Sequence, residues 1–282
     1  MHLTPLKTLA LAALMSGIGP VLVRESPVGP AATAFWRLAI ALPFALWTGR
    51  FALWMAPRDI ALALFSGVLL AADLVLWNNA ILRTSVMEAT VLVMTFPLIV
   101  AVGEIWVLGR LLSSNLIVGG LIALTGTVVI ASGKAPGHHN LVGDVMALAA
   151  AFFYAASLLL SAQLCRRNEA SGVTFWVIFG AMAGTVPFAL NEPVLLPGTF
   201  GNFAYLAAYG LLTYGSYALY NSALSRLPTT LVAISGYGQP IIATSLAALL
   251  LNEIPSGTSV IGALIIVAGL ILATKSRDSN AT

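Results

Sequence analysis

Two oppositely charged side chains lie at similar depths in neighbouring apolar runs of the sequence. Arg37 lies about six residues into its run and Asp73 about seven residues from the end of the next, so at 1.5 Å per helical residue both are roughly 9–10 Å deep. A charge at the centre of a bilayer costs about 2.5–3.5 kcal/mol or more unless it is paired or hydrated. Two hypotheses stay open: a structural ion pair between adjacent helices, or an arginine that meets a substrate carboxylate in one state and Asp73 in the other.

Two acidic residues share the apolar run that follows. Glu88 stands near its start, where the carboxylate could bind a substrate ammonium or a proton, or could extend to the membrane interface beside Arg83. Glu104 stands near the other end and is expected to extend toward Arg110. Glu88 is therefore the leading acidic candidate for a binding site.

Aromatic and amide side chains gather in several runs and suit a wall around a substrate with an apolar side chain and a zwitterionic head. The candidates are Trp77, Asn78, Tyr154, Tyr214, Tyr217, Tyr237 and Gln239. Trp77 and Tyr220 could instead belong to an interfacial aromatic belt. For Tyr214, Tyr217 and Tyr237 a cavity is favoured, because a phenol buried in lipid would lack a hydrogen-bond partner.

Motifs of the common enzyme classes are missing from the sequence. It contains no G-x-x-x-x-G-K-[ST] loop for ATP, no G-x-S-x-G and no H-E-x-x-H. The adjacent His138 and His139 lack the spacing and the companions of a metal site, and the single Cys165 cannot form an intramolecular disulfide. We therefore expect no catalytic residue, no metal and no cofactor, and not an enzyme.

The composition is that of a helical membrane protein. Of 282 residues, 59% are hydrophobic and 8% are charged, and the mean hydropathy is +0.96, whereas soluble domains have roughly 25% charged residues. The net charge of +3 comes from cations scattered singly in short loops, so no nucleic-acid surface is indicated. The lipid bilayer is the expected partner.

Apolar runs of about 18 to 23 residues, long enough to cross a bilayer, predict ten transmembrane helices. The predicted spans are residues 6–23, 31–49, 59–80, 85–107, 114–132, 143–164, 173–190, 202–222, 229–250 and 257–274.

The second half of the chain repeats the first. The octet LWNNAILR at residues 76–83 returns as LYNSALSR at 219–226, which is 143 positions later, and Pro97 and Pro240 keep the same offset. We predict two five-helix repeats, 1–137 and 138–282, inverted because an odd number of crossings reverses the entry side. The two prolines interrupt equivalent helices and are candidate hinges.

The distribution of Lys and Arg predicts the orientation. With the N-terminus inside, nine of these residues fall in inner loops and three, Arg24, Arg83 and Lys134, in outer loops. Both termini are therefore expected in the cytoplasm. Because the duplication supplies both halves of a pathway, a monomer is expected to suffice.

The residues resemble a known group, the EamA-type ten-helix members of the drug/metabolite transporter (DMT) superfamily. The match is strongest from Pro240 through Asn252-Glu253 to the Gly262 and Gly269 helix, although the first repeat has Arg110 where the second has Glu253. The stretch Phe35-Trp36-Arg37-Leu38 resembles the family's second helix, and Ser235–Pro240 is similar to the ninth helix of YddG-type exporters of aromatic amino acids.

This resemblance implies a secondary transporter of the bacterial inner membrane that exports amino acids, aromatic or otherwise apolar, and related metabolites by alternating access. Proton-coupled efflux of small drugs through Glu88 is the alternative. A nucleotide-sugar or phosphate-ester exchanger would need several intramembrane cations, and only Arg37 qualifies. An intramembrane enzyme is the alternative from another class.

Overall fold

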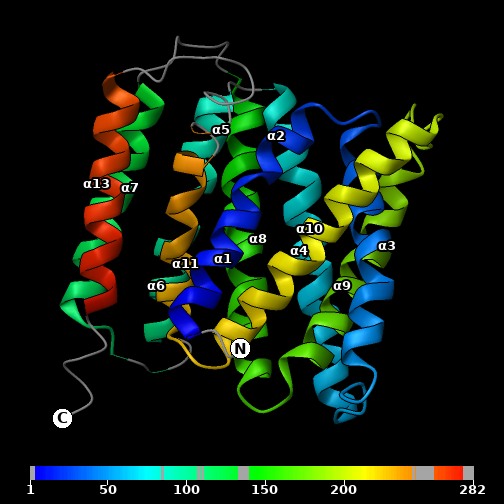
Figure 1. Ribbon diagram of the computed structural model, residues 1–282, viewed down its shortest axis with the longest axis horizontal. Coiled ribbons are helices and arrows are strands. Elements are labelled where there is room, and N and C mark those ends of the chain that lie inside the picture. Colours follow the sequence, from blue (N-terminus) through cyan, green and yellow to red (C-terminus); the bar gives the residue numbers. More distant parts are fainter. Residues whose placement is uncertain are drawn as a thin grey trace.

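A computed structural model describes residues 4–83, 86–106, 109, 111–132, 140–242, 245 and 257–275. Within these ranges every regular element is a helix (Figure 1). The helices are α1 (Pro5–Gly17), α2 (Gly19–Arg24), α3 (Pro30–Gly49), α4 (Pro57–Arg83), α5 (Val86–Val93), α6 (Phe96–Trp106), α7 (Ser114–Ser132), α8 (Leu141–Cys165), α9 (Ala170–Ala189), α10 (Phe200–Leu224), α11 (Thr229–Ile234), the 3₁₀ helix η1 (Ser235–Gly238) and α13 (Gly257–Thr274).

These helices coincide with the predicted apolar spans, which confirms the all-helical prediction. Seven stretches of the described chain are long and apolar enough to cross a membrane, and the apolar segment Val91–Trp106 is shorter. Although α10 is 25 residues long, it is not one of the seven, because tyrosines, glycines and small polar residues interrupt its apolar sequence. The last part of the predicted span 229–250 lies outside the described residues.

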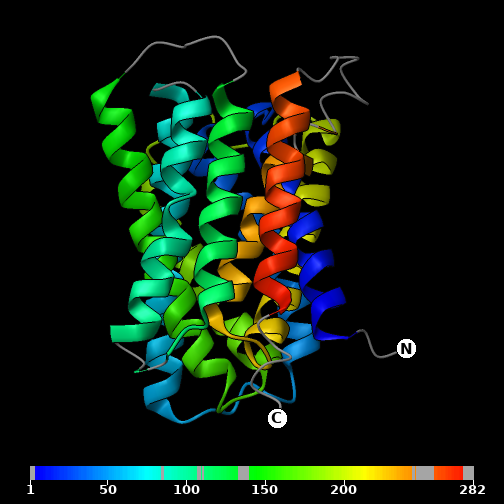
Figure 2. The same cartoon turned by 90° about the vertical axis from the view of Figure 1, so that its left-hand side faces the viewer.

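The helices form one bundle with α4 near its centre. α4 packs between α8 and α9, α3 packs between α9 and α10, and α1 lies along α10. α7 and α13 form a pair at one edge of the bundle (Figures 1 and 2). α1 begins and α13 ends at the same face, the lower one in Figure 1, where α10 is also connected to α11.

Glycines allow α7 and α13 to touch through their backbones. A Cβ atom on Gly126 would lie 2.7 Å from the carbonyl oxygen of Gly262, and one on Gly119 would lie 2.6 Å from that of Gly269. The earlier glycine of one helix faces the later glycine of the other, so the two helices are antiparallel. Close approach through small residues is typical of helix packing in membranes.

Both predicted kinks are interruptions of helices. α5 ends at Val93 and α6 begins at Phe96, directly before Pro97, while η1 tightens the chain just before Pro240. Proline has no amide hydrogen to donate, and its ring clashes with the carbonyl four residues earlier, so a regular helix cannot continue through it without distortion. Pro43, by contrast, lies within the continuous helix α3.

Candidate functional site

A cavity of about 130 Å³ lies among α1, α3, α4, α8 and α10, next to both interrupted segments. It brings together six of the residues predicted from the sequence. They are Arg37, Asp73, Trp77, Tyr154, Tyr217 and Gln239. These residues come from both the first and the second half of the sequence.

Arg37 is held in place by two tyrosines of α10. The side chain is 7% exposed, and its Nη1 and Nη2 donate to the hydroxyls of Tyr209 and Tyr217, the latter at 3.3 Å. The guanidinium also lies 5.1 Å from the centre of the Tyr209 ring, within cation–π range. Its Nε is buried without a hydrogen-bond partner among the described residues. The guanidinium is therefore fixed in position at the cavity wall while part of its donor capacity stays unused.

Asp73 does not form the predicted ion pair with Arg37. Within the described part of the chain, no salt bridge or hydrogen bond joins these two side chains, since Arg37 binds α10 instead. Asp73 is 7% exposed and lines the same cavity. The cavity thus brings a carboxyl group and a guanidinium together without a direct contact between them in the described structure.

Trp77 follows Asp73 by four positions and therefore lies on the same face of α4. Its indole Nε1 is buried without a partner in the described structure. Beside it, Tyr154 packs edge-on against Phe96 with ring centres 4.7 Å apart. Tyr220 is also in this wall, 3.1 Å from the hydroxyl of Ser16, rather than in an interfacial belt. These side chains give the cavity an aromatic wall with polar edges.

Three of the predicted residues lie away from the cavity. The Asn78 side chain is fully buried, and its Nδ2 donates to the carbonyl of Pro30 at 2.8 Å, because one step along α4 turns it toward α3. The Tyr214 hydroxyl donates to Thr48 at 2.9 Å. Tyr237 is buried in the core, and its hydroxyl has no hydrogen-bond partner in the described part of the chain. The cavity predicted for Tyr214 and Tyr237 therefore does not include them.

Glu88 belongs to α5, but its side chain lies outside the described residues. Its predicted role in binding stays a prediction.

Sequence reasoning missed a polar stripe on α10. Tyr209, Thr213, Ser216, Tyr217 and Tyr220 all line the cavity, and their spacings of four, three, one and three residues place them on one helical face. This periodicity was visible in the sequence and was the signal that could have identified Tyr209, the main partner of Arg37.

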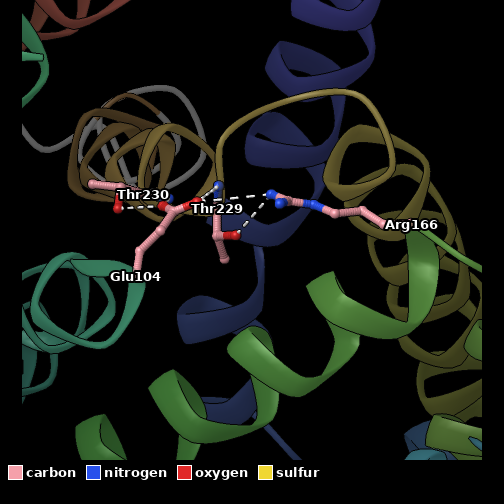
Figure 3. Close-up of polar contacts among 4 residues, drawn as sticks. All are labelled: Glu104, Arg166, Thr229 and Thr230. Carbon is pink, nitrogen blue, oxygen red and sulfur yellow. Dashed lines mark hydrogen bonds and ion pairs between the residues drawn. The ribbon is translucent and has the colours of Figure 1, made fainter. Parts of the chain in front are cut away.

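A second polar cluster joins α6, α11 and the end of α8 (Figure 3). Glu104 of α6 is 1% exposed and accepts hydrogen bonds from residues at the start of α11. Its carboxylate is buried between α6 and α11, while Arg110, toward which it was predicted to extend, lies outside the described residues. Together with Arg166 it borders a second cavity, of about 460 Å³.

Comparisons with known proteins agree with this architecture. The model of the EamA-like transporter family matches twice, over residues 5–132 and 141–275. A probable amino-acid metabolite efflux pump of Salmonella typhimurium is 26% identical over 182 residues, which cover 59% of this chain and 60% of the relative. The chain thus aligns with only about three-fifths of that relative's length.

Two further matches cover more of the chain. The pseudopaline exporter CntI of Pseudomonas aeruginosa is 24% identical over 223 residues, 79% of this chain and 78% of that protein. A solved structure superposes with a TM-score of 0.80 at 19% identity, covering 97% of this chain and 96% of the other, which shows a shared fold. The chain belongs to the EamA-like transporter family of the DMT superfamily, and its long apolar helices are those of a multi-pass membrane protein.

Proposed function

We propose that this protein is a secondary exporter of amino acids, aromatic or otherwise apolar ones, and related zwitterionic metabolites, and that the central cavity is its substrate site. One observation carries the proposal: Arg37 and Asp73 line the same small cavity without pairing with each other. A zwitterion supplies both missing partners, a carboxylate for the guanidinium and an ammonium for the carboxylate. Two matching relatives bear the names of exporters.

Arg37 is the residue we assign to the substrate carboxylate. An arginine presents several donors in a planar fork that matches a carboxylate, and two tyrosines already hold it in place. Prior fixation lowers the entropy that binding costs. Asp73 is assigned to the ammonium, because nothing in the described chain donates a hydrogen bond to it.

The remaining wall is assigned to the substrate side chain. Trp77, Phe96 and Tyr154 present aromatic surface to the cavity, and Gln239 adds a polar edge. At about 130 Å³ the cavity is smaller than the roughly 300–1,000 Å³ of pockets for drug-sized ligands. Size and the presence of Arg37, which repels cations, both favour an amino acid over the alternative of a cationic drug.

We further propose alternating access between two inverted five-helix repeats, 1–137 and 138–282, in the bacterial inner membrane, with both termini cytoplasmic and a monomer sufficient. Support comes from the antiparallel α7 and α13, which are repeat counterparts in direct contact, and from the equivalent interruptions before Pro97 and Pro240. α3 and α8 end and α4 begins at the face where α1 begins (Figure 1), and these ends carry Arg50, Arg58, Arg166 and Arg167, in agreement with the positive-inside rule.

Counterflow in proteoliposomes tests the substrate site. We expect saturable exchange of labelled phenylalanine or leucine, with phenylalanine amide and N-acetylphenylalanine at least about tenfold weaker as competitors, because each lacks one charged partner. Arg37→Gln should abolish exchange, whereas Arg50→Gln, which changes an exposed arginine stacked on Phe51, should preserve it. Transport of cationic drugs without any exchange of amino acids would favour drug efflux instead.

A further inference from the structure

Glu104, in the first half of the chain, forms hydrogen bonds with the start of α11, in the second half. Its Oε1 accepts a hydrogen bond from the backbone N–H of Thr229 at 3.2 Å. Its Oε2 accepts from the backbone N–H of Thr230 at 2.8 Å and from the hydroxyl of Thr230 at 2.7 Å (Figure 3). One buried carboxylate of α6 therefore satisfies the free amides at the start of α11, where the helix dipole also favours negative charge.

Arg166, at the end of α8, adds a third element to this cluster. Its Nη2 lies 3.7 Å from Oε1 of Glu104 and 3.4 Å from the hydroxyl of Thr229. The Arg166 side chain is 23% exposed, whereas that of Glu104 is 1% exposed. The contact therefore ties α6, α8 and α11 together at the face where α1 begins and α13 ends (Figure 1).

The segment from Leu227 to Gln239, which contains α11 and η1, links the linings of the two cavities. Leu227 and Pro228, just before it, line the larger cavity with Glu104 and Arg166, while Gln239, just after η1, lines the central cavity. All six residues of α11 are buried. We propose that α11 is the inner gate of the transporter and that Glu104, with Arg166, is the positioning residue that holds this gate closed.

The carboxylate that forms the hydrogen bonds between Glu104 and the start of α11 has no equivalent at the corresponding position of the repeat. At the repeat offset of 143 positions, Ala247 corresponds to Glu104, and Val86 and Met87 correspond to Thr229 and Thr230. The residue types of the second repeat therefore offer no carboxylate for the equivalent contact at the other end. Because only the inner end has the carboxylate for this contact, the protein favours the state that is closed at the inner face. Removal of Glu104 should therefore raise the population of the state that is open there.

The inference depends on alternating access but on no particular substrate, so its test uses none. In a Cys165→Ser background, Ser216→Cys places one thiol in the wall of the central cavity. A membrane-impermeant thiol reagent is applied to inside-out and to right-side-out vesicles. Glu104→Ala should speed labelling from the cytoplasmic side at least about tenfold and slow it from the other side, because several hydrogen bonds to a buried charge are lost.

Asp59→Asn is the matched control. Asp59 is also a buried carboxylate, bound to Arg167 at 2.7 Å and to Asn168 at 2.8 Å, and its hydrogen-bond and ion-pair partners in the described chain include no residue of α11. Its substitution should leave the labelling rates unchanged. Unchanged rates in Glu104→Ala, or an equal change in Asp59→Asn, would overturn the proposal.

Thr230→Val is the second test variant, and it is used if the Glu104→Ala protein does not fold. It removes the hydroxyl donor at 2.7 Å and retains the backbone amide, so a smaller shift in the same direction is expected. No shift in a folded Thr230→Val protein would contradict the gate. A shift in these proteins without any amino-acid exchange would retain the gate and reject the proposed substrate.

Discussion

At the scale of single residues, Arg37 depends on tyrosine hydroxyls rather than on an opposite charge. The hydroxyls of Tyr209 and Tyr217 accept from the guanidinium without cancelling its charge. Direct pairing with Asp73 would have made the arginine a structural element, whereas neutral partners leave its charge free for an anion. This difference makes the tyrosines part of the proposed selectivity.

Tyr209→Phe should therefore weaken recognition of the carboxylate while the fold persists. We expect KM for amino-acid exchange to rise roughly three- to tenfold, which corresponds to the net contribution of about one hydrogen bond, roughly 0.5–1.5 kcal/mol. Tyr214→Phe is the control, since that hydroxyl binds Thr48 away from the cavity. A KM that is the same in both variants would show that Tyr209 does not position the arginine.

At the scale of elements, the interrupted helices are where motion can be accommodated with little loss of hydrogen bonding. The helix is interrupted between α5 and α6 ahead of Pro97, and α11 changes to the 3₁₀ geometry of η1 ahead of Pro240. Bending there sacrifices few backbone hydrogen bonds, whereas bending a continuous helix in lipid would expose several.

Pro240→Ala should slow turnover more than it weakens binding, because the substitution permits a straighter and stiffer helix. Pro43→Ala, within continuous α3, should change turnover much less. The measurement compares the maximal exchange rate with the affinity from competition. An unchanged rate in Pro240→Ala would remove the hinge hypothesis.

The α7–α13 pair contributes to stability rather than to motion, because the backbones of the two helices are already in contact. Gly126→Leu should lower the melting temperature in detergent, since its Cβ would lie 2.7 Å from a backbone oxygen; overpacking of this kind costs about 1–3 kcal/mol. Gly257→Ala, where a Cβ meets no atom within 4 Å, is the control. Equal stability of the two variants would argue against close packing there.

At the scale of the whole molecule, the loop between α3 and α4 and the loop between α9 and α10 lie on opposite faces of the bundle. Trp54, between α3 and α4, and Leu196, between α9 and α10, are exposed at opposite ends of the bundle. In the Cys165→Ser background, a thiol at residue 54 should react from the cytoplasmic side and one at residue 196 from the other side. Labelling of both from one side would refute the proposed orientation.

Much of this molecule follows from the sequence, because lipid requires continuous apolar helices and makes their runs easy to recognise. Local patterns also placed Arg37, Asp73 and Trp77 in polar surroundings. Glu104 was beyond this reasoning, since its partner Thr230 is 126 positions away and a carboxylate near the end of a run has no local sign of burial. Trp77 and Asn78 are neighbours on α4 that face different sides of the helix. Tertiary packing decides which of these sides faces the cavity.

The polarity of α10 has a consequence for how the protein enters the membrane. A segment that carries the lining of the cavity on one face cannot lower its free energy fully by contact with lipid alone. Its partners α1 and α3 precede it in the chain and are synthesised first. Stable insertion of α10 therefore depends on its docking against helices already in the bilayer. The helix contacts that form the binding site are thus also the contacts that stabilise α10 during insertion.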